Sequence, residues 1–136
     1  MITKLASFIS ECPAFSGEVV KTNFLGKEVG RASLEATNNR RPVTQYADGG
    51  ALMRYSFVLA LRESFGFGEM DSQRISDKCI AIENWIEEQN ISRDTLERFV
   101  GAEVVSIGVS KCFELAKSDG ASARYEAEIE VVCLTI

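Results

Sequence analysis

The clearest pattern in the chain is an alternation of large apolar residues with polar or small ones over residues 51–63. The large apolar residues all occupy odd positions: Met53, Tyr55, Phe57, Leu59 and Leu61. Only an extended strand places alternate side chains on one face of a sheet. The pattern therefore predicts a long, half-buried strand that the chain enters through a turn at residues 46–50.

The N-terminal third predicts a short helix followed by strands. Apolar residues recur there at intervals of three and four, with Thr3 as the expected cap and Pro13 just beyond the end of the helix. The stripe consists of Ile2, Leu5, Phe8, Ile9 and Cys12. Residues 18–25 and 31–37 are strand candidates, and the polar residues 37–42 are expected to form a loop.

A second helix follows the long strand. Residues 64–70 contain two glycines and two aromatic residues and are expected to form a loop that contacts a partner. Asp71 or Ser72 can cap the helix, Asn90 can end it, and Trp85 lies beside its apolar stripe. The stripe is Ile75, Cys79, Ile82 and Ile86, and the side expected to face outward carries Glu83, Glu87 and Glu88.

The last third returns to extended patterning after a short helix predicted over residues 92–99. Apolar residues occupy odd positions from Val105 to Leu115, and a bulge or a strand edge can explain the exception at Lys111. A turn at residues 117–120 leads to a final strand over residues 123–136, which predicts a hairpin. One face of the final strand is apolar, and the other carries Glu126, Glu128 and Glu130.

These elements predict a single α+β domain over residues 1–136. The expected order is helix, strand, strand, strand, helix, short helix, strand, strand. The sheet is expected to be mostly antiparallel, with about four to five strands, and the two main helices to pack on it. A chain of 136 residues is long enough for one core, and 46% hydrophobic with 26% charged residues is typical of a globular protein.

Composition narrows the classes of function. The formal net charge of −5 argues against wrapping around nucleic acid, because phosphate binding draws its affinity from lysine and arginine. The apolar runs fall short of the roughly 20 residues of a membrane helix, and the N-terminal residues lack the apolar segment of a secretory signal. We therefore expect a protein made in the cytoplasm, without membrane association.

Residues for catalysis or metal binding are scarce. The chain contains no histidine, and its four cysteines are too widely spaced for a zinc or redox motif. Each cysteine lies in an apolar pattern, which favours burial in a reducing compartment over reactivity. The glycines around Phe67 lack the lysine and spacing of a phosphate loop. We expect no catalytic residue, no cofactor and no metal, and hence a protein that is not an enzyme.

Three segments together resemble a known family. They are Gln-Tyr-Ala-Asp-Gly-Gly at residues 45–50 leading into Tyr-Ser-Phe at 55–57, Asn-Trp-Ile-Glu-Glu-Gln at 84–89, and Ala-Arg-Tyr-Glu at 123–126. With the opening helix that ends near Cys12 and Pro13, they resemble the small minor tail (minor capsid) proteins of phages and prophages of Gram-positive bacteria. That family is similar to the tail terminators of long-tailed bacteriophages, and the likeness covers essentially the whole chain.

The resemblance implies a structural virion protein located in the tail. Members act as a homo-oligomeric ring, usually hexameric, that caps the tail tube, stops its growth and joins it to the head-tail connector. The candidate contacts with neighbouring subunits or the tube protein are Arg40, Arg41, Phe65, Phe67 and Met70. The face with Glu126, Glu128 and Glu130, or the helix with Glu83, Glu87 and Glu88, can supply an acidic lumen through which DNA passes without specific binding.

Three alternatives stay open. One is a head-completion or neck connector protein, which also uses small α+β rings in virion assembly. Another is a small enzyme with a carboxylate-only site, which requires a deep pocket with perturbed acids. The third is a small cytosolic module that pairs an exposed strand edge with a peptide.

Overall fold

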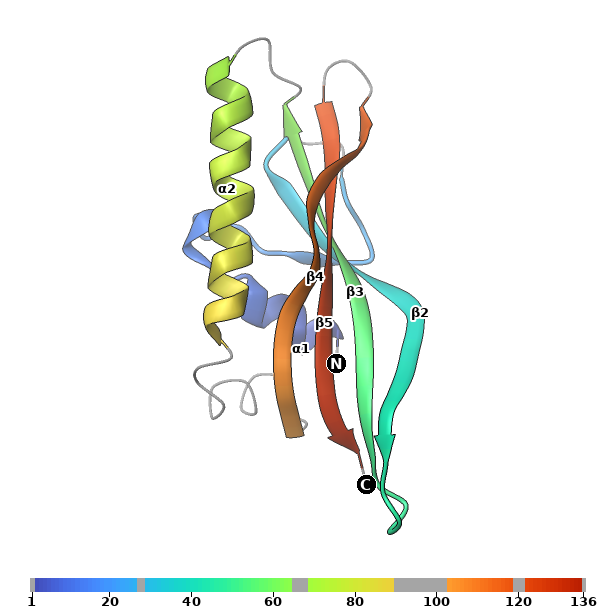
Figure 1. The fold of residues 1–136 in the computed structure, drawn as a ribbon. Helices are drawn as coiled ribbons and strands as arrows, with labels where there is room; N and C mark the ends of the chain where they lie inside the picture. The colour runs from blue at the N-terminus through green and yellow to red at the C-terminus, as the bar shows by residue number, and fades with distance from the viewer. Residues whose placement is uncertain (1, 27–28, 65–68, 90–102, 119–121, 136) are drawn as a thin grey trace.

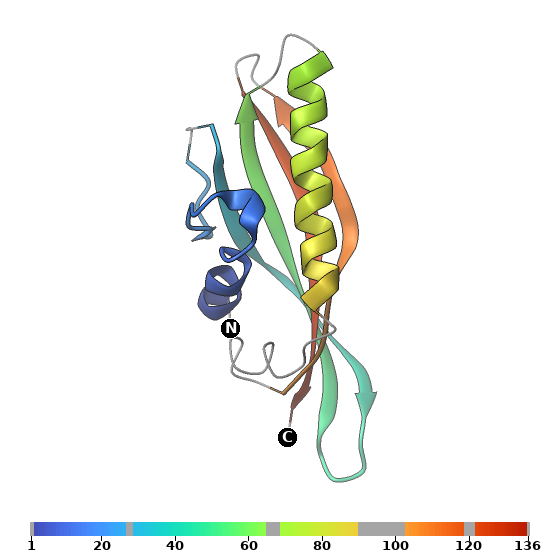
Figure 2. The same cartoon turned by 90° about the vertical axis from the view of Figure 1, so that its left-hand side faces the viewer.

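The structure is a computed structural model that describes residues 2–26, 29–64, 69–89, 103–118 and 122–135. Within these residues, five strands form one sheet in the order β1-β2-β3-β5-β4, and two α-helices cover one of its faces (Figures 1 and 2). The elements in chain order are α1 (Ile2–Ile9), a 3₁₀ turn η1 (Pro13–Phe15), β1 (Lys21–Thr22), β2 (Arg31–Gln45), β3 (Ala51–Ser64), α2 (Glu69–Glu88), β4 (Glu103–Ser118) and β5 (Ser122–Thr135).

The predicted class is confirmed: the fold is α+β with a mostly antiparallel sheet. Only the short pair β1–β2 is parallel among the described strands. The central strand β3 pairs with β5 without interruption from Ala51↔Thr135 to Ser64↔Ser122. This continuity follows from the alternation that predicted β3, because both strands keep one apolar face over their whole length.

The core lies between the sheet and the two helices. Leu59 and Leu61 of β3 are fully buried on the side that faces the helices, as are Ile129 and Val131 of β5. Both predicted helical stripes are buried, which confirms their spacing: Leu5, Phe8 and Ile9 in α1 and Ile75, Cys79, Ile82 and Ile86 in α2. The rings of Phe8 and Trp85 join the two helices, with centroids 5.2 Å apart and planes tilted by 41°.

The N-terminal strand and helix boundaries differ from those predicted. Of residues 18–25 only Lys21–Thr22 form a strand, because the chain turns at Asn23, whose φ is 54°. Thr3 is not a cap, since α1 already includes Ile2. The strand number and order therefore agree with the prediction only roughly. The helix predicted over residues 92–99 lies outside the described residues.

Residues 37–42 form part of β2 and not the predicted loop. Ala36 pairs with Phe57 and Arg40 with Tyr55, so four steps along β2 oppose two steps along β3. This bulge absorbs the polar residues, and Thr37 anchors it by donating its hydroxyl to the carbonyl of Ser56 at 2.7 Å. Polar composition alone did not reveal a strand that is held by its partner across the sheet.

Bulges also change which residues of β4 are buried. The expected shift near Lys111 is present, between Val109 and Glu114. A further register shift between Val104 and Ser106 turns Val104 inward at 2% exposure and leaves Val105 exposed. Leu115 is 49% exposed, so the predicted apolar face of this strand is interrupted at both ends.

Candidate interaction surfaces

The most prominent surface is a hairpin arm, which we define as residues 40–55. It consists of the end of β2, the turn after it and the start of β3. Its tip extends beyond the ends of β4 and β5 and away from both helices (Figures 1 and 2). Residues 42–49 are all exposed, including the apolar side chains of Val43 at 45% and Tyr46 at 48%.

The turn at the tip of the arm is closed by hydrogen bonds. The Tyr46 amide donates to the Gly50 carbonyl at 2.8 Å, and the Gly50 amide donates to the Asp48 carboxylate at 3.0 Å. Gly49 has a φ of 91°, a conformation that glycine adopts without a steric penalty. The predicted turn at residues 46–50 is therefore confirmed, and it holds Tyr46 at a defined position.

Two glutamates of α2 cap the edge strand β4. Glu87 accepts a hydrogen bond from the amide of Val109, and Glu83 accepts one from the amide of Phe113, each at 2.8 Å. Glu87 is exposed, as predicted, and Glu83 is half-buried, so the side of α2 expected to face only solvent also contacts the edge of the sheet. Four residues span about 6 Å along a helix but about 13 Å along a strand. The bulges of β4 shorten that span, so side chains one helical turn apart reach both amides.

Gly108 lies beside this cap. A Cβ atom there would lie 3.4 Å from Oε1 of Glu87, at the near limit of ordinary van der Waals contact. At the opposite edge of the sheet, Asn23 accepts a hydrogen bond from the amide of Ala36 at 2.8 Å. Side-chain oxygens thus accept hydrogen bonds from backbone amides at both outer edges of the sheet, where these bonds hinder pairing with a further strand.

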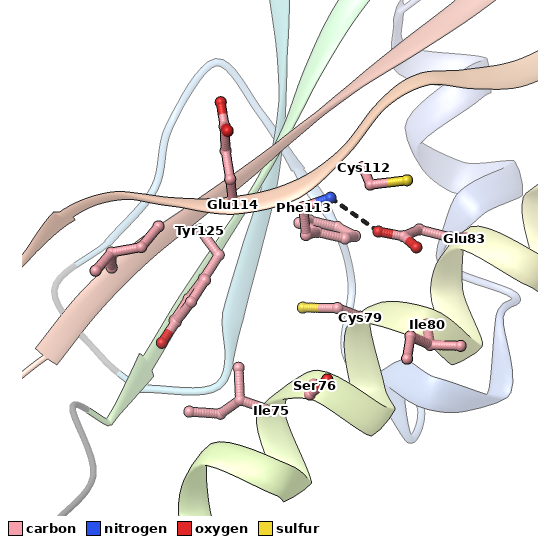
Figure 3. A pocket seen from close by; sticks show the side chains of 10 residues that line it. Ile75, Ser76, Cys79, Ile80, Glu83, Cys112, Phe113, Glu114 and Tyr125 are labelled. Carbon is pink, nitrogen blue, oxygen red and sulfur yellow. Dashed lines mark hydrogen bonds between the residues drawn. The ribbon is translucent and has the colours of Figure 1, made fainter.

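A groove of about 360 Å³ lies between α2 and residues 112–115 of β4 (Figure 3). Ile75, Cys79 and Ile80 line it from α2, Phe113 and Leu115 from β4, and Tyr125 from β5. Burial, followed by the charges of Glu83 and Glu63, raises the pKa of the Cys79 thiol to about 11. This thiol is therefore protonated at neutral pH and is a poor nucleophile.

The other cysteines divide into buried and exposed groups. Cys12 and Cys133 are buried as expected, and burial raises the pKa of each thiol. Cys112 is exposed on β4, which corrects the expectation that all four cysteines are buried. It lies within the register shift between Lys111 and Glu114, where alternation does not determine which side chain faces the helices.

The helix-free face of the sheet carries the predicted row of carboxylates, but each has a polar partner. Glu126 accepts a hydrogen bond from Arg124 at 2.6 Å, and Glu130 lies 3.5 Å from the guanidinium of Arg54. Glu128 accepts a hydrogen bond from the Ser110 hydroxyl at 2.8 Å. All three are half-buried, so this face has mixed charge and is not uniformly acidic.

The predicted contact residues are spread over the molecule. Arg40 and Arg41 lie in the arm, where they pair in register with Tyr55 and Arg54. Met70 lies in the first turn of α2, so the predicted loop ends earlier and the helix begins earlier than expected. Phe65 and Phe67 lie outside the described residues. The arm and the start of α2 are at opposite ends of the molecule (Figure 1).

Among the described residues, no group of three or more cysteine, aspartate or glutamate side chains is placed to hold a metal ion. No described helix is both long and apolar enough to span a membrane.

Comparison with known proteins gives no identification, since no protein-family model matches this chain and no curated protein matches its sequence.

Proposed function

We propose that this chain is a structural virion assembly protein that acts as a tail terminator. In this proposal, copies made in the bacterial cytoplasm form a ring, usually of six subunits, on the end of the tail tube. The ring stops tube growth and binds the head-tail connector. The resemblance of residues 45–57, 84–89 and 123–126 to phage tail proteins suggests this role, and the hairpin arm is the structural observation that carries it.

The projecting arm supports the proposal of a ring. In a cyclic ring, a surface of one subunit binds a different surface of the next, so a projecting element on one side is useful. The arm extends beyond the part of the sheet covered by helices and presents Val43 and Tyr46 about half exposed. A tyrosine in a fixed turn supplies contact area with little loss of conformational entropy on binding.

The capped edges of the sheet favour the arm as the surface through which one subunit contacts the next. Uncapped edge strands can pair with one another and extend a sheet from molecule to molecule. Here Glu83 and Glu87 occupy amides of β4, and Asn23 occupies one of β2. These caps leave the arm as the better candidate for contact with a neighbouring subunit or the tube.

An acidic lumen is part of the same proposal. Glu126, Glu128 and Glu130 lie on the helix-free face, and only Glu126 and Glu130 lie beside arginines within the described residues. Net negative charge on a lumen would let DNA pass without binding. Reversal of the charge at Glu128 should slow genome passage and reduce infectivity, and unchanged infectivity would contradict the lumen.

The test is a tube-capping assay with an arm variant. The chain is mixed with the tail tube protein encoded in the same gene cluster, and electron microscopy records rings, bound tube ends and tube length. We expect rings at tube ends and a limit to tube growth. The double variant Val43→Asp/Tyr46→Asp should neither form rings at tube ends nor limit tube growth, because charge at the tip of the arm opposes burial in an interface.

A matched control separates this effect from general disturbance of the surface. Val19 is 68% exposed in the segment before β1, far in sequence from the arm, so Val19→Asp should cap tubes normally. Both the arm variant and the Val19→Asp control should keep the thermal midpoint of the parent chain. Absence of rings and of tube binding with the parent chain would refute the terminator role, and binding to the portal side alone would favour a neck connector.

A second candidate function rests on the groove between α2 and β4. Its exposed apolar residues Ile80 and Leu115, at 50% and 49%, suit a small module that binds an extended peptide. The glutamate caps on Val109 and Phe113 count against strand addition at this edge. A protein that stays monomeric at high concentration and on tube ends, yet binds peptides in a way that Leu115→Asp abolishes, would favour this alternative.

A further inference from the structure

A row of four cationic residues crosses the helix-free face of the sheet. Arg31 of β2 is in register with Arg62 of β3, Arg62 with Arg124 of β5, and Arg124 with Lys117 of β4. Residues in register on adjacent strands share a face, with strands about 5 Å apart. The row is therefore a property of strand pairing, since its members lie far apart in sequence.

Two members of the row are already neutralised by carboxylates. Arg31 forms an ion pair with Glu18 at 2.7 Å. Arg124 donates to both carboxylate oxygens of Glu35 at 2.7 and 2.8 Å, and to Glu126 at 2.6 Å. These acids relieve part of the repulsion that like charges directly opposite one another create in a sheet.

Arg62, inside the row, lacks such a partner. Its Nε atom is buried without a hydrogen bond, and its NH1 group reaches the Ser122 hydroxyl only at 3.5 Å, the outer limit of a hydrogen bond. Its neighbours in register on both sides are arginines. Lys117 is exposed and forms no ion pair with any residue that the structure describes.

We propose that this row is a binding site for one phosphate group, centred on Arg62. Because Nε of Arg62 is buried, a phosphate oxygen can accept only from the terminal nitrogens of its guanidinium, and the fork of an arginine matches the spacing of two phosphate oxygens. Arg62 and Lys117 supply the charge that the row's own carboxylates do not neutralise. The bound anion would separate Arg62 from the arginines beside it. This inference does not depend on the proposed role in tail assembly.

The test is a titration of the full chain with sodium phosphate at constant ionic strength, balanced with sodium chloride. Nuclear magnetic resonance follows the Nε–H signals of the arginines. We expect the Arg62 signal to shift and saturate, while the Arg54 signal stays unchanged. Phosphate should also raise the thermal midpoint, because a ligand that binds only the folded state stabilises it.

Variants distinguish the site from general attraction of anions. Arg62→Gln should weaken phosphate binding about tenfold, equal to about 1.4 kcal/mol. Arg54→Gln is the matched control, on the same strand and face but outside the row, and should bind phosphate as the parent chain does. Should Arg62→Gln fail to fold, the exposed Lys117→Gln replaces it, with an expected loss of about threefold, about half the tenfold free-energy difference.

The source of the phosphate group is read from a parallel titration with a short DNA duplex. Tighter binding of DNA that Arg62→Gln weakens would assign the site to a nucleic-acid phosphate. Binding of inorganic phosphate alone would assign it to a free anion. Either result supports the site, and binding of DNA through Arg62 would also contradict a lumen on this same face through which DNA passes without binding. An unchanged Arg62 signal with both probes, or equal losses in Arg62→Gln and Arg54→Gln, would overturn the proposal.

Discussion

Glu63 shows how one residue fixes the position of a helix. It lies on the side of β3 that faces the helices, only 1% of it is exposed, and it forms an ion pair with Lys78 of α2. Arg74, one turn earlier in α2, lies 3.7 Å from the same carboxylate. A buried charge without a partner is costly, so these contacts determine the register of α2 on the sheet.

Replacement of this carboxylate should destabilise the fold. Glu63→Gln keeps the shape of the side chain but leaves Lys78 without its anionic partner. Because the Lys78 side chain is 18% exposed, we expect a loss of about 3 kcal/mol in the free energy of unfolding, the lower end for a broken buried pair. Urea denaturation measures it, and a loss no larger than that of the exposed control Glu88→Gln would contradict this role.

The raised pKa of Cys79 predicts a loss of stability in alkali. Its thiol has a pKa of about 11 in the folded protein, against 9.0 for an exposed thiol in the unfolded chain, so above pH 9 the unfolded chain releases this proton first. The protonated thiol of Cys79 contributes up to about 2–3 kcal/mol to the free energy of unfolding. This contribution is complete below pH 9 and is lost as the pH rises to about 11. Urea unfolding at pH 8 and pH 10.5 should show a smaller pH-dependent loss for Cys79→Ala than for the parent chain.

At the scale of elements, α2 both covers the core and closes a sheet edge. One side of the helix buries Ile82 and Ile86, while Glu83 and Glu87 extend to the amides of β4. Hydrogen bonds to charged acceptors contribute about 1.5–3 kcal/mol when measured by removal of one partner. The helix thus protects the edge strand that lies beside it.

Removal of the two caps should open β4. In Glu83→Ala/Glu87→Ala we expect faster hydrogen exchange at the amides of Val109 and Phe113, and concentration-dependent association through the freed edge. Hydrogen-exchange mass spectrometry and light scattering measure the two effects. Glu88→Ala is the control, because its exposed side chain adjoins Glu87 in sequence. Unchanged exchange at both amides would show that the caps have no such role.

At the scale of the whole molecule, the long sheet is covered unevenly. The helices pack against the part that contains Leu59, Leu61 and Ile129, whereas the hairpin arm extends past them (Figure 2). Burial of apolar surface provides most of the stability of a fold. The arm must therefore depend on its turn and its strand pairing more than on packing.

This uneven cover predicts a gradient of local stability along β3. Amides at residues 51–55 should exchange with solvent well before those at residues 57–61, although both segments pair with β2 and β5. Hydrogen exchange read at single residues by nuclear magnetic resonance tests this. Equal protection of both segments would mean that the arm unfolds only with the whole domain.

Much of the fold could be predicted from the sequence, but little of the surface detail could. Alternation over residues 51–63 predicted β3, and helical spacing predicted the buried stripe of α2. The roles of Glu63, Glu83 and Glu87 were missed, since their partners lie at least 15 residues away along the chain. The only sequence signal for these roles was the spacing of Glu83 and Glu87, which lie four positions apart on one helix. That spacing does not indicate contact with the edge of a sheet.

The sequence by itself determined the long strands β3 and β5 and the buried stripes of α1 and α2, because the spacing of apolar side chains follows from local backbone geometry and needs no knowledge of partners. Only the tertiary structure decided the bulges of β2 and β4, the caps on the sheet edges and the cationic row across the sheet. Each of these depends on which residue of a distant strand or helix stands opposite, and that register is set when the whole sheet assembles against its helices.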